Sequence, residues 1–325
     1  QTAWLKYYYP VEFMAALMTS VIDNPPKVAE YILNCRQMGI RLLPPDINKG
    51  ESAFSVEENE STEKTGEETF KYNKSIRYGL SAIKSIGKPV IDAIVRERNQ
   101  NGIYRNFRNF VERLSGKELN KRTIENFIKA GALDGLCDNR KQLMMIYVQV
   151  VDSVNQEKKN AMAGQMSLFD FVAEEDKKDF EIRMPDVEEY DKEQLLAFEK
   201  EVLGVYISGH PLEKYEKMWQ KNISATTMDF AYQEELHGSR LFDGAEEIIG
   251  GMVEGITIKH TKNNKTMVFL TIEDLLGTVE VVVFPRQYEI YRNSITQDGK
   301  LFIQGHVSAE EEKASKLICD KIWKF

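Results

Sequence analysis

The stretch "TMVFLTIEDLLGTVEVVVF", residues 266–284, contains two runs of β-branched and apolar residues on either side of a short turn at 275–277. Runs of this length and composition, bounded by turn residues, predict two antiparallel β-strands. In the second run, alternation places Val279, Val281 and Val283 on one face and Glu280 and Val282 on the other, as a one-sided barrel wall requires.

The first run does not decide which of its faces is buried. Successive side chains of a strand point to opposite faces, so one alternating set forms the core. The two sets that fit are Met267, Phe269 and Thr271, or Val268, Leu270 and Ile272. Phe269 is therefore either a core residue or a residue of the outer face.

Three more β-rich runs flank this pair, at 248–261, 300–308 and 315–325. A short helical segment, "PRQYEIYR" (285–292), separates the third run from the fourth. Five strands with a helix between the third and fourth is the element order of an OB-fold. We therefore expect residues 246–325 to form a five-stranded OB-fold barrel.

A cluster of lysines marks one end of the expected barrel. Lys259, Lys262 and Lys265 lie on or beside the loop between the first two strands, close in sequence to Phe269. In OB-folds this loop commonly faces the ligand, and an aromatic ring there can stack on a base. Single-stranded nucleic acid is the leading candidate ligand, and a protein contact is the alternative.

The composition is that of a water-soluble protein with more than one domain. The 325 residues are 42% hydrophobic and 29% charged, which is enough for two or three domains with proper cores. No run of about eighteen apolar residues and no signal peptide is present, so we expect a cytoplasmic protein with no membrane contact. The three cysteines are far apart and fit reduced, buried thiols. The chain opens on Gln1, as a piece of a longer protein would.

The net charge of −8 hides two blocks of opposite sign. Between Lys71 and Lys141 there are sixteen Lys and Arg against seven Asp and Glu, a local balance of +9. Between Phe171 and Glu201 there are twelve acidic residues against five basic ones, a local balance of −7. The basic block predicts a surface for a polyanion, whereas the acidic block does not.

The basic block contains "LSAIKSIGKPVIDAIVRER", residues 80–98. A helix, a tight turn and a second helix would aim free backbone N–H groups outward, where a phosphate can accept them. Lys84 and Lys88 flank that turn, which also contains Ser85 and Gly87. The pattern resembles the helix-hairpin-helix DNA-binding motif, with Ser85 in place of its usual first glycine.

A second segment, "LNKRTIENFIKAGALD" (119–134), resembles a degenerate partner hairpin, with Lys121 and Arg122 at its turn. Backbone amides and lysines address phosphates rather than base edges, so the two hairpins would bind duplex DNA without regard to sequence. The alternative is an ordinary pair of helical hairpins with a basic, solvated face.

The segment "QMSLF" (165–169) follows small residues and precedes the acidic block. Leu168 and Phe169 have little local structure to pack against, and Gln165 and Met166 precede them. An exposed apolar pair in a polar segment is a candidate anchor for a pocket on another protein. It resembles the sliding-clamp-binding peptide of bacterial replication proteins. The alternative is a local contact with a neighbouring domain.

No catalytic residue and no metal site is predicted. The four histidines are dispersed, and no pair of acidic residues follows a strand beside a phosphate-binding loop. The segment "IED" (272–274) ends a barrel strand and is expected to close a turn.

The order of these segments, with "KEVLGVYISGHPL" (200–212) and "AGALD" (130–134), resembles the C-terminal portion of the bacterial DNA polymerase III alpha subunit, DnaE type. The resemblance implies a mixed α and β fold with five parts. These are the end of the fingers domain (1–45), a connecting loop or hairpin (46–75), a tandem helix-hairpin-helix DNA-binding domain (76–150), a clamp-binding segment and helical linker (151–245), and the OB-fold domain (246–325).

The resemblance also implies a role in DNA replication. Duplex DNA, single-stranded template, the beta sliding clamp and other replisome subunits would be its partners. The family's Mg²⁺-binding aspartates lie in a palm domain, which this sequence does not contain, so no cofactor is expected for the fragment and its status as an enzyme by itself stays open. Two other functions fit the residues, namely a nucleic-acid-binding module of a repair or RNA-processing enzyme and a protein-interaction scaffold.

Overall fold

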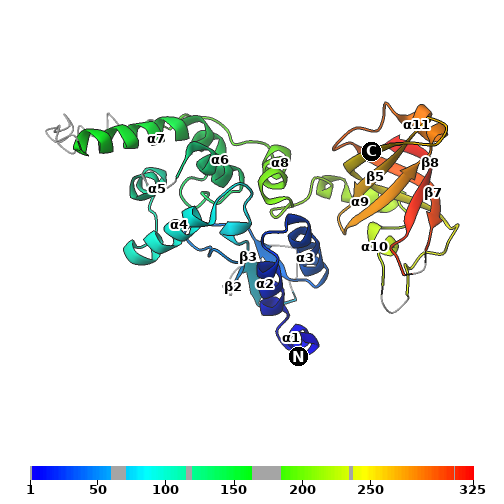
Figure 1. Cartoon of the computed structure of the whole chain (residues 1–325), viewed down its shortest axis with the longest axis horizontal. Helices are drawn as coiled ribbons and strands as arrows, with labels where there is room; N and C mark the ends of the chain where they lie inside the picture. The colour runs from blue at the N-terminus through cyan, green and yellow to red at the C-terminus, as the bar shows by residue number, and fades with distance from the viewer. Residues whose placement is uncertain (1, 60–70, 115–118, 163–183, 234–236, 311) are drawn as a thin grey trace. The chain divides into compact units, whose positions relative to one another are not determined.

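A computed structural model of the chain describes residues 2–59, 71–114, 119–162, 184–233, 237–310 and 312–325 (Figure 1). The chain forms two compact units, Gln1–Gly209 and His210–Phe325, and each has its own hydrophobic core. The first unit is mostly helical with one small sheet, and the second is a β-barrel with short helices. The expected mixed fold, a helical region followed by a five-stranded OB-fold barrel, is confirmed.

The helices of the first unit begin and end at residues that suit helix termini. Asn24 caps one of them by accepting a hydrogen bond from the Lys27 N–H at 3.3 Å, and Gly204 ends another in the left-handed conformation. They are α1 (Thr2–Tyr8), α2 (Pro10–Ser20), α3 (Pro25–Gln37), the 3-10 helix η1 (Leu80–Ala82), α4 (Lys88–Asn101), α5 (Phe107–Leu114), α6 (Lys121–Lys129), α7 (Arg140–Met162) and α8 (Lys192–Leu203).

The first unit also contains a three-stranded sheet, formed by β1 (Arg41–Leu43), β2 (Ser55–Glu58) and β3 (Lys74–Arg77). The central strand β3 pairs in parallel with β1 and antiparallel with β2. Ile76, which is fully buried, lies between Leu42 and Val56. The parallel pair was not predicted, because strands of three or four residues are too short to display an alternating pattern.

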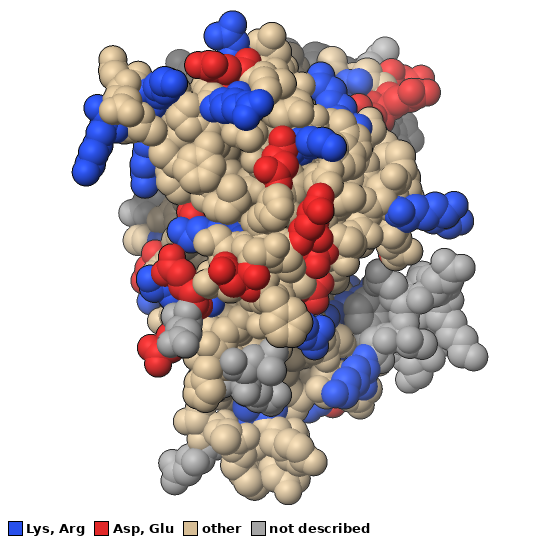
Figure 2. All heavy atoms as spheres, turned by 90° about the vertical axis from the view of Figure 1, so that its right-hand side faces the viewer, with Lys and Arg blue, Asp and Glu red and all other residues tan. Residues whose placement is uncertain are grey.

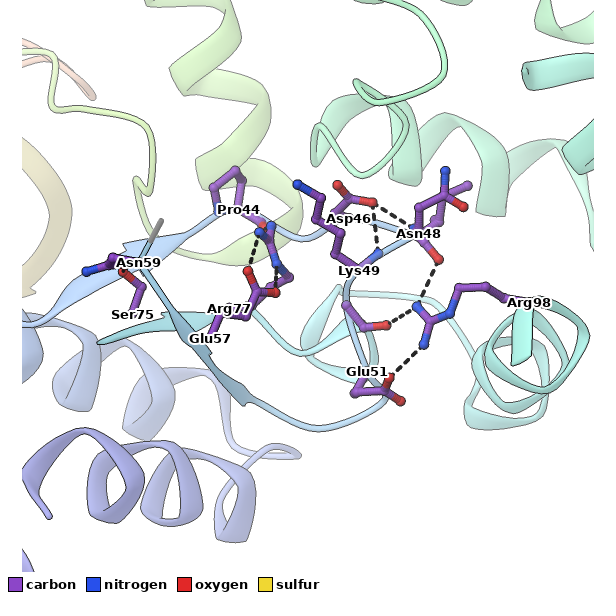
Figure 3. A network of polar contacts seen from close by, with 12 residues as sticks. Pro44, Asp46, Asn48, Lys49, Glu51, Glu57, Asn59, Ser75, Arg77 and Arg98 are labelled. Atoms are coloured by element: carbon purple, nitrogen blue, oxygen red, sulfur yellow. Dashed lines mark hydrogen bonds and ion pairs between the residues drawn. The ribbon is translucent and has the colours of Figure 1, made fainter. Parts of the chain in front are cut away.

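A loop at residues 44–51 connects this sheet to the helices. Its turn is closed by the Asp46 carboxylate, which accepts hydrogen bonds from the N–H groups of Asn48 at 2.7 Å and Lys49 at 3.2 Å (Figure 3). The Asn48 amide donates to the Tyr104 carbonyl at 2.9 Å and accepts from the Tyr104 N–H at 2.8 Å. The loop is thereby joined to the chain between α4 and α5.

Arg98 of α4 holds the same loop from the other side. Its guanidinium donates to the carbonyls of Ile47 at 3.1 Å and Gly50 at 2.5 Å, and to the Glu51 carboxylate at 2.6 Å (Figure 3). Arg98 is only 7% exposed. A buried arginine needs acceptors for its N–H groups, and the loop carbonyls provide them. The Ile47 N–H in turn donates to the Ala132 carbonyl after α6 at 3.0 Å.

The second unit is a closed barrel with strand order β4-β5-β6-β8-β7. The helix α11 (Pro285–Tyr291) lies between β6 and β7, as the OB-fold order predicts. The strands are β4 (Glu246–His260), β5 (Thr266–Glu273), β6 (Thr278–Val283), β7 (Lys300–Ser308) and β8 (Lys316–Lys324). The helices η4 (Glu213–Tyr215), α9 (Glu216–Asn222) and α10 (Thr227–Phe230) precede the barrel.

Burial along the strands decides which side chains fill the barrel. In β5, Val268, Leu270 and Ile272 are fully buried, so Phe269 lies on the outer face and is half-buried. In β6, the expected inward set Val279, Val281 and Val283 is buried in the barrel core. The choice that sequence alternation left open for β5 is thus settled by the structure.

Asp274 closes the turn after β5, as expected for the "IED" segment. Its carboxylate accepts from the N–H groups of Leu276 at 2.7 Å and Gly277 at 3.0 Å. It also accepts from the Thr227 hydroxyl at 2.6 Å and the Thr227 N–H at 2.9 Å, which fastens α10 to the barrel. Burial raises the pKa of the Asp274 carboxyl.

The cysteines are free thiols, of which Cys35 and Cys319 are buried and Cys137 is partly buried. Burial raises the pKa of Cys35 and of Cys319 to about 12, so both remain protonated near neutral pH. In the part of the chain that the structure describes, no helix is both long enough and apolar enough to cross a membrane.

Replacing Arg98 by Ala is expected to lower the free energy of unfolding of the first unit by about 1–3 kcal/mol, because the loop carbonyls lose their buried donor. Denaturant unfolding followed by helical circular dichroism, to which the first unit contributes most, measures the change. The control is Arg96→Ala on the same helix, where Arg96 is exposed and the expected change is below about 0.5 kcal/mol. Equal stabilities of the two variants would contradict the role given to Arg98.

Candidate nucleic-acid interface

The turn between η1 and α4 contains four of the residues predicted to bind DNA. Lys84, Ser85, Gly87 and Lys88 are all exposed, whereas Ile83 and Ile86 are buried. The two isoleucines anchor the turn in the core while the residues between and after them face solvent. The structure therefore brings together all four residues that the sequence analysis assigned to this turn.

Ser85 has a φ of 62°, in the left-handed region that glycine adopts most readily. It replaces the first glycine of the expected motif, and it keeps the backbone conformation that this glycine would supply. A non-glycine residue in this region costs about 1–2 kcal/mol, so the surrounding contacts must hold the turn in place.

Two hydrogen bonds fix the backbone at Lys84. Its N–H donates to the Val202 carbonyl of α8 at 2.8 Å, and its carbonyl accepts from the Asn126 side chain of α6 at 3.0 Å. Asn126 is buried and was not recognised as a functional residue in the sequence, where a polar residue in a helix gives no sign of such a long-range contact. Both peptide groups are tied down, whereas the Lys84 side chain is exposed and its ammonium lies beside Gly204.

The N–H groups of Ser85, Gly87 and Lys88 make no hydrogen bond within the described part of the chain. Lys88 begins α4, so its N–H also lies at the positive end of the helix dipole. Exposed N–H groups at a helix N-terminus, next to two lysines, are suited to receive a phosphate.

The second predicted turn precedes α6. Residues 115–118 lie outside the described residues, so only its C-terminal half is seen. The Asn120 side chain caps α6 by accepting from the Thr123 N–H at 2.9 Å. Lys121 and Arg122 are both exposed, but the Lys121 ammonium lies 2.8 Å from the Asp152 carboxylate of α7. Arg122 forms no ion pair with a described residue, so it is a stronger candidate than Lys121 for a contact to a DNA phosphate.

Half of the basic residues that the sequence places in this region form ion pairs with carboxylates of the chain. Eight of the sixteen Lys and Arg form ion pairs with carboxylates, namely Lys74, Arg77, Arg98, Arg108, Arg113, Lys121, Lys129 and Arg140. The exposed residues without such a pair in the described chain include Lys84, Lys88 and Arg122 at the two turns, and Lys71, Arg96 and Arg105 elsewhere. The local balance of +9 overstates the free charge but points to the correct elements.

The barrel brings Lys259 and Phe269 together on its outer face. The Lys259 ammonium lies 4.4 Å from the centroid of the Phe269 ring, a cation–π contact. Lys262 and Lys265 are exposed on the connection between β4 and β5. All four residues predicted for this surface thus lie at one end of the β4–β5 hairpin.

Phe284 was not predicted as part of this surface. It follows β6 directly, two positions after Val282, which pairs with Phe269 across the strands. Residues two apart on a strand share a face, so Phe284 lies on the same side as Phe269, and it is 44% exposed. The sequence run "VVVF" showed only a strand end and gave no signal that this ring is exposed.

The side of the molecule on which Figure 1 draws the barrel is shown with its charges in Figure 2. Lys and Arg side chains are interspersed there with Asp and Glu, and no large field of one sign covers this view. On this face the positive charge is distributed over separate side chains and does not form a broad basic surface.

The residues predicted to bind a sliding clamp, Gln165, Met166, Leu168 and Phe169, lie outside the described residues. The described residues also include no group of three or more His, Cys, Asp or Glu that could hold a metal ion.

Two family models match the chain. The helix-hairpin-helix motif model matches residues 39–143, and the OB-fold nucleic acid binding domain model matches residues 248–324. These ranges contain both candidate turns and the Lys259–Phe269 surface. Among solved structures, the yeast mitochondrial single-stranded DNA-binding protein Rim1 matches 26% of this chain and 97% of its own, with 12% identity and a TM-score of 0.22, a likeness too low to carry an inference.

Curated protein sequences match a larger part of the chain than these models and structures do. The DNA polymerase III subunit alpha of Borreliella burgdorferi is 34% identical over 99% of this chain, and that of Thermus aquaticus is 33% identical over 99%. The chain is similar, over nearly its whole length, to part of the DNA polymerase III alpha subunit. It spans 26% of the length of the Borreliella protein and 24% of the Thermus protein, so it corresponds to about a quarter of these relatives.

Gly87→Ala separates a structural role of this glycine from a binding role. Gly87 has a φ of −73°, which any residue adopts, and an added Cβ would lie 3.6 Å from its nearest neighbour, Pro89. The substitution is therefore expected to change the free energy of unfolding by no more than about 1 kcal/mol. The added methyl group would obstruct a phosphate at the turn, so the dissociation constant for duplex DNA is expected to rise about tenfold. Unchanged affinity in fluorescence anisotropy would show that nothing approaches Gly87 closely.

Proposed function

We propose that this chain is the DNA-holding and clamp-tethering part of a replicative DNA polymerase alpha subunit. The observation that carries the proposal is the turn at residues 84–88. Its free backbone N–H groups, its two unpaired lysines and its rigid attachment to the core together suit a phosphate of duplex DNA.

Binding through this turn would be independent of base sequence. Backbone N–H groups and lysine ammonium groups reach phosphate oxygens, which are the same for every base pair. A polymerase that must copy any template needs such contacts. Arg122 at the start of α6 would add a second contact, and the Lys121–Asp152 ion pair would have to open before Lys121 could contribute.

The barrel would receive a single strand on its Lys259–Phe269 face. Bases of an unpaired strand can stack on the exposed ring of Phe284 and on the half-buried ring of Phe269, and the lysines of the β4–β5 hairpin can approach the phosphates. In the full subunit this strand would be the template.

The segment at 165–169 would dock on the sliding clamp. A clamp that encircles the duplex and holds the polymerase by a short peptide raises the local concentration of the polymerase at the DNA end. Such tethering can increase the overall affinity by about 10²–10⁴-fold without new contacts to DNA. Other replisome subunits would join the complex through the full alpha subunit.

The proposal places the polymerisation chemistry, and the Mg²⁺ that it needs, in the parts of the family's chain that this quarter does not match. The described residues do not fit such an ion, because they contain no cluster of carboxylates that could hold it. No catalytic step is therefore derived from them.

Replacing both Lys84 and Lys88 by Glu should weaken duplex binding at all sequences equally. Each lost phosphate contact is expected to reduce the slope of log affinity against log salt by about 0.9. Fluorescence anisotropy at several salt concentrations measures the slope. The matched control replaces Lys6 and Lys27 by Glu, which makes the same change in net charge at exposed positions of α1 and α3. An equal effect of the two double variants would contradict a specific role of the turn. If the affinity for duplex DNA did not depend on salt concentration, the alternative function of a protein-interaction scaffold would be favoured.

Replacing Gln165, Leu168 and Phe169 by Ala should abolish capture of the chain by a purified sliding clamp. Duplex binding in the absence of the clamp should not change, because the hairpin residues are intact. Surface plasmon resonance with immobilised clamp measures the first effect. If the unaltered chain shows no affinity for a clamp, the tethering part of the proposal is wrong, whereas the DNA-binding part is judged by the salt slope above.

A further inference from the structure

Tyr78 is a buried residue that lies two positions before η1, outside the 84–88 turn. It follows β3, and its N–H donates to the Leu43 carbonyl at 3.0 Å. Its ring meets the Phe54 ring edge-on at a centroid distance of 5.0 Å, and it is 1% exposed. The sheet and the core therefore fix both the backbone and the ring of Tyr78.

The Tyr78 hydroxyl joins η1 to the end of α8. It donates to the carbonyl of Leu203, the last residue of α8, at 3.0 Å, and the Ala82 carbonyl of η1 accepts at 3.3 Å. The hydroxyl has one proton, so the shorter contact, to α8, is the stronger of these two hydrogen bonds. Burial raises the pKa of the Tyr78 phenol, so the hydroxyl remains a donor at neutral and moderately basic pH.

The last two carbonyls of α8 find their partners outside the helix. Carbonyls at the C-terminus of a helix have no acceptor role within it. The Val202 carbonyl accepts from the Lys84 N–H at 2.8 Å, and the Leu203 carbonyl accepts from the Tyr78 hydroxyl. The Lys84 backbone and the Tyr78 hydroxyl are thus linked through adjacent peptide groups of one helix end.

The Lys84 ammonium lies at the same helix end. A Cβ added to Gly204, the residue that ends α8, would lie 3.4 Å from Lys84 Nζ and 3.5 Å from Lys84 Cε. The side chain therefore packs against the glycine backbone. The C-terminal end of a helix dipole is negative and stabilises a nearby cation. The end of α8 thus helps to place both the backbone and the ammonium of Lys84.

The turn depends on such support because its own conformation is costly. Ser85 is held at a φ of 62°, and a residue in this region stays there only when its surroundings fix it. Without the Tyr78 hydroxyl, the buried Leu203 carbonyl would lose its donor and the last turn of α8 would fray more readily. Loss of this hydroxyl is therefore expected to loosen the turn although no residue of the turn changes.

We propose that Tyr78 is a positioning residue for duplex binding. Its hydroxyl fixes the last turn of α8, and α8 in turn fixes Lys84, which contacts a phosphate of the DNA. Tyr78 is buried and acts only through these groups. The inference rests on the proposed duplex-binding function of the 84–88 turn and adds to it a residue that lies outside the turn.

Tyr78→Phe in the whole chain tests the inference, because it removes the hydroxyl and keeps the ring on Phe54. The dissociation constant for duplex DNA is expected to rise about fivefold, the loss that corresponds to one hydrogen bond of ordinary net strength. The slope of log affinity against log salt should not change, because both lysines of the turn still reach phosphates. Hydrogen exchange of the Lys84 amide in the free chain should become faster, because its bond to Val202 opens more often.

Tyr104→Phe is the matched control. Tyr104 is also 1% exposed and lies in the same unit, and its hydroxyl donates to the Ile94 carbonyl of α4 at 2.8 Å, a bond that does not involve α8. Each variant loses one buried hydrogen bond, so the denaturation midpoint should fall by similar amounts. Only Tyr78→Phe should weaken duplex binding or speed exchange at Lys84. Binding is measured at a temperature at which circular dichroism shows that both variants are folded.

A double-mutant cycle connects the effect to the turn. In a chain that carries Lys84→Glu and Lys88→Glu, the turn repels a phosphate. Adding Tyr78→Phe to that chain should change its residual duplex affinity by less than about twofold. A fivefold loss in this background as well would show that Tyr78 acts elsewhere in the chain, and the inference would be wrong.

Two further outcomes would overturn the inference and leave the proposed function intact, provided that the lysine variants still reduce the salt slope. In the first, Tyr78→Phe binds duplex DNA as tightly as the unaltered chain. In the second, Tyr78→Phe and Tyr104→Phe weaken binding equally, so that the loss follows from general stability. If Lys84→Glu with Lys88→Glu instead matches its control for net charge, the proposed function fails and this inference fails with it.

Discussion

The peptide groups on both sides of Lys84 are held by α8 and α6, and this constraint underlies the candidate duplex-binding site. A turn that presents free N–H groups to solvent tends to lose its shape, because water can satisfy those groups in many conformations. Here the Val202 carbonyl and the Asn126 side chain hold the turn, and two buried isoleucines anchor it. The turn is thereby organised before a ligand arrives, which lowers the entropy that binding would cost.

Ion pairs within the first unit involve half of the basic residues around the turn. Ion pairs such as Arg108–Glu157 and Lys129–Glu201 join elements that are distant in sequence. Among the described residues, they leave exposed cations without an ion pair at the two turns and also at Lys71, Arg96 and Arg105. A turn of this kind would hold a phosphate locally rather than attract DNA over a broad surface. On the face shown in Figure 2, charges of both signs are likewise interspersed.

Much of this architecture could be predicted from sequence, for identifiable reasons. The barrel strands are long, and apolar and polar side chains alternate clearly along them. These two features predict the order of the strands and, for most of them, which side chains point into the barrel. The hairpin turn was recognisable because its glycine, its lysines and the flanking apolar residues are close in sequence. The three-stranded sheet was missed because its strands are short and β1 pairs with a strand more than thirty residues later. The roles of Asn126 and Arg98 were missed because each depends on partners about forty to fifty residues away.

The buried face of a strand could not be predicted where both of its alternating sets of side chains were apolar. Phe269 was undecided for this reason, and the exposed position of Phe284 gave no signal at all. Exposed aromatic residues of a barrel look like core residues in a sequence. Only the pairing of the strands shows which rings remain outside.

The central claim is that the exposed amides of the 84–88 turn are themselves the groups that receive DNA. Hydrogen–deuterium exchange of the backbone amides, measured for the chain alone and with saturating duplex DNA, tests it most directly. The account predicts that the amides of Ser85, Gly87 and Lys88 exchange rapidly in the free chain and slowly in the complex. Tight duplex binding with no change in exchange at this turn would contradict it.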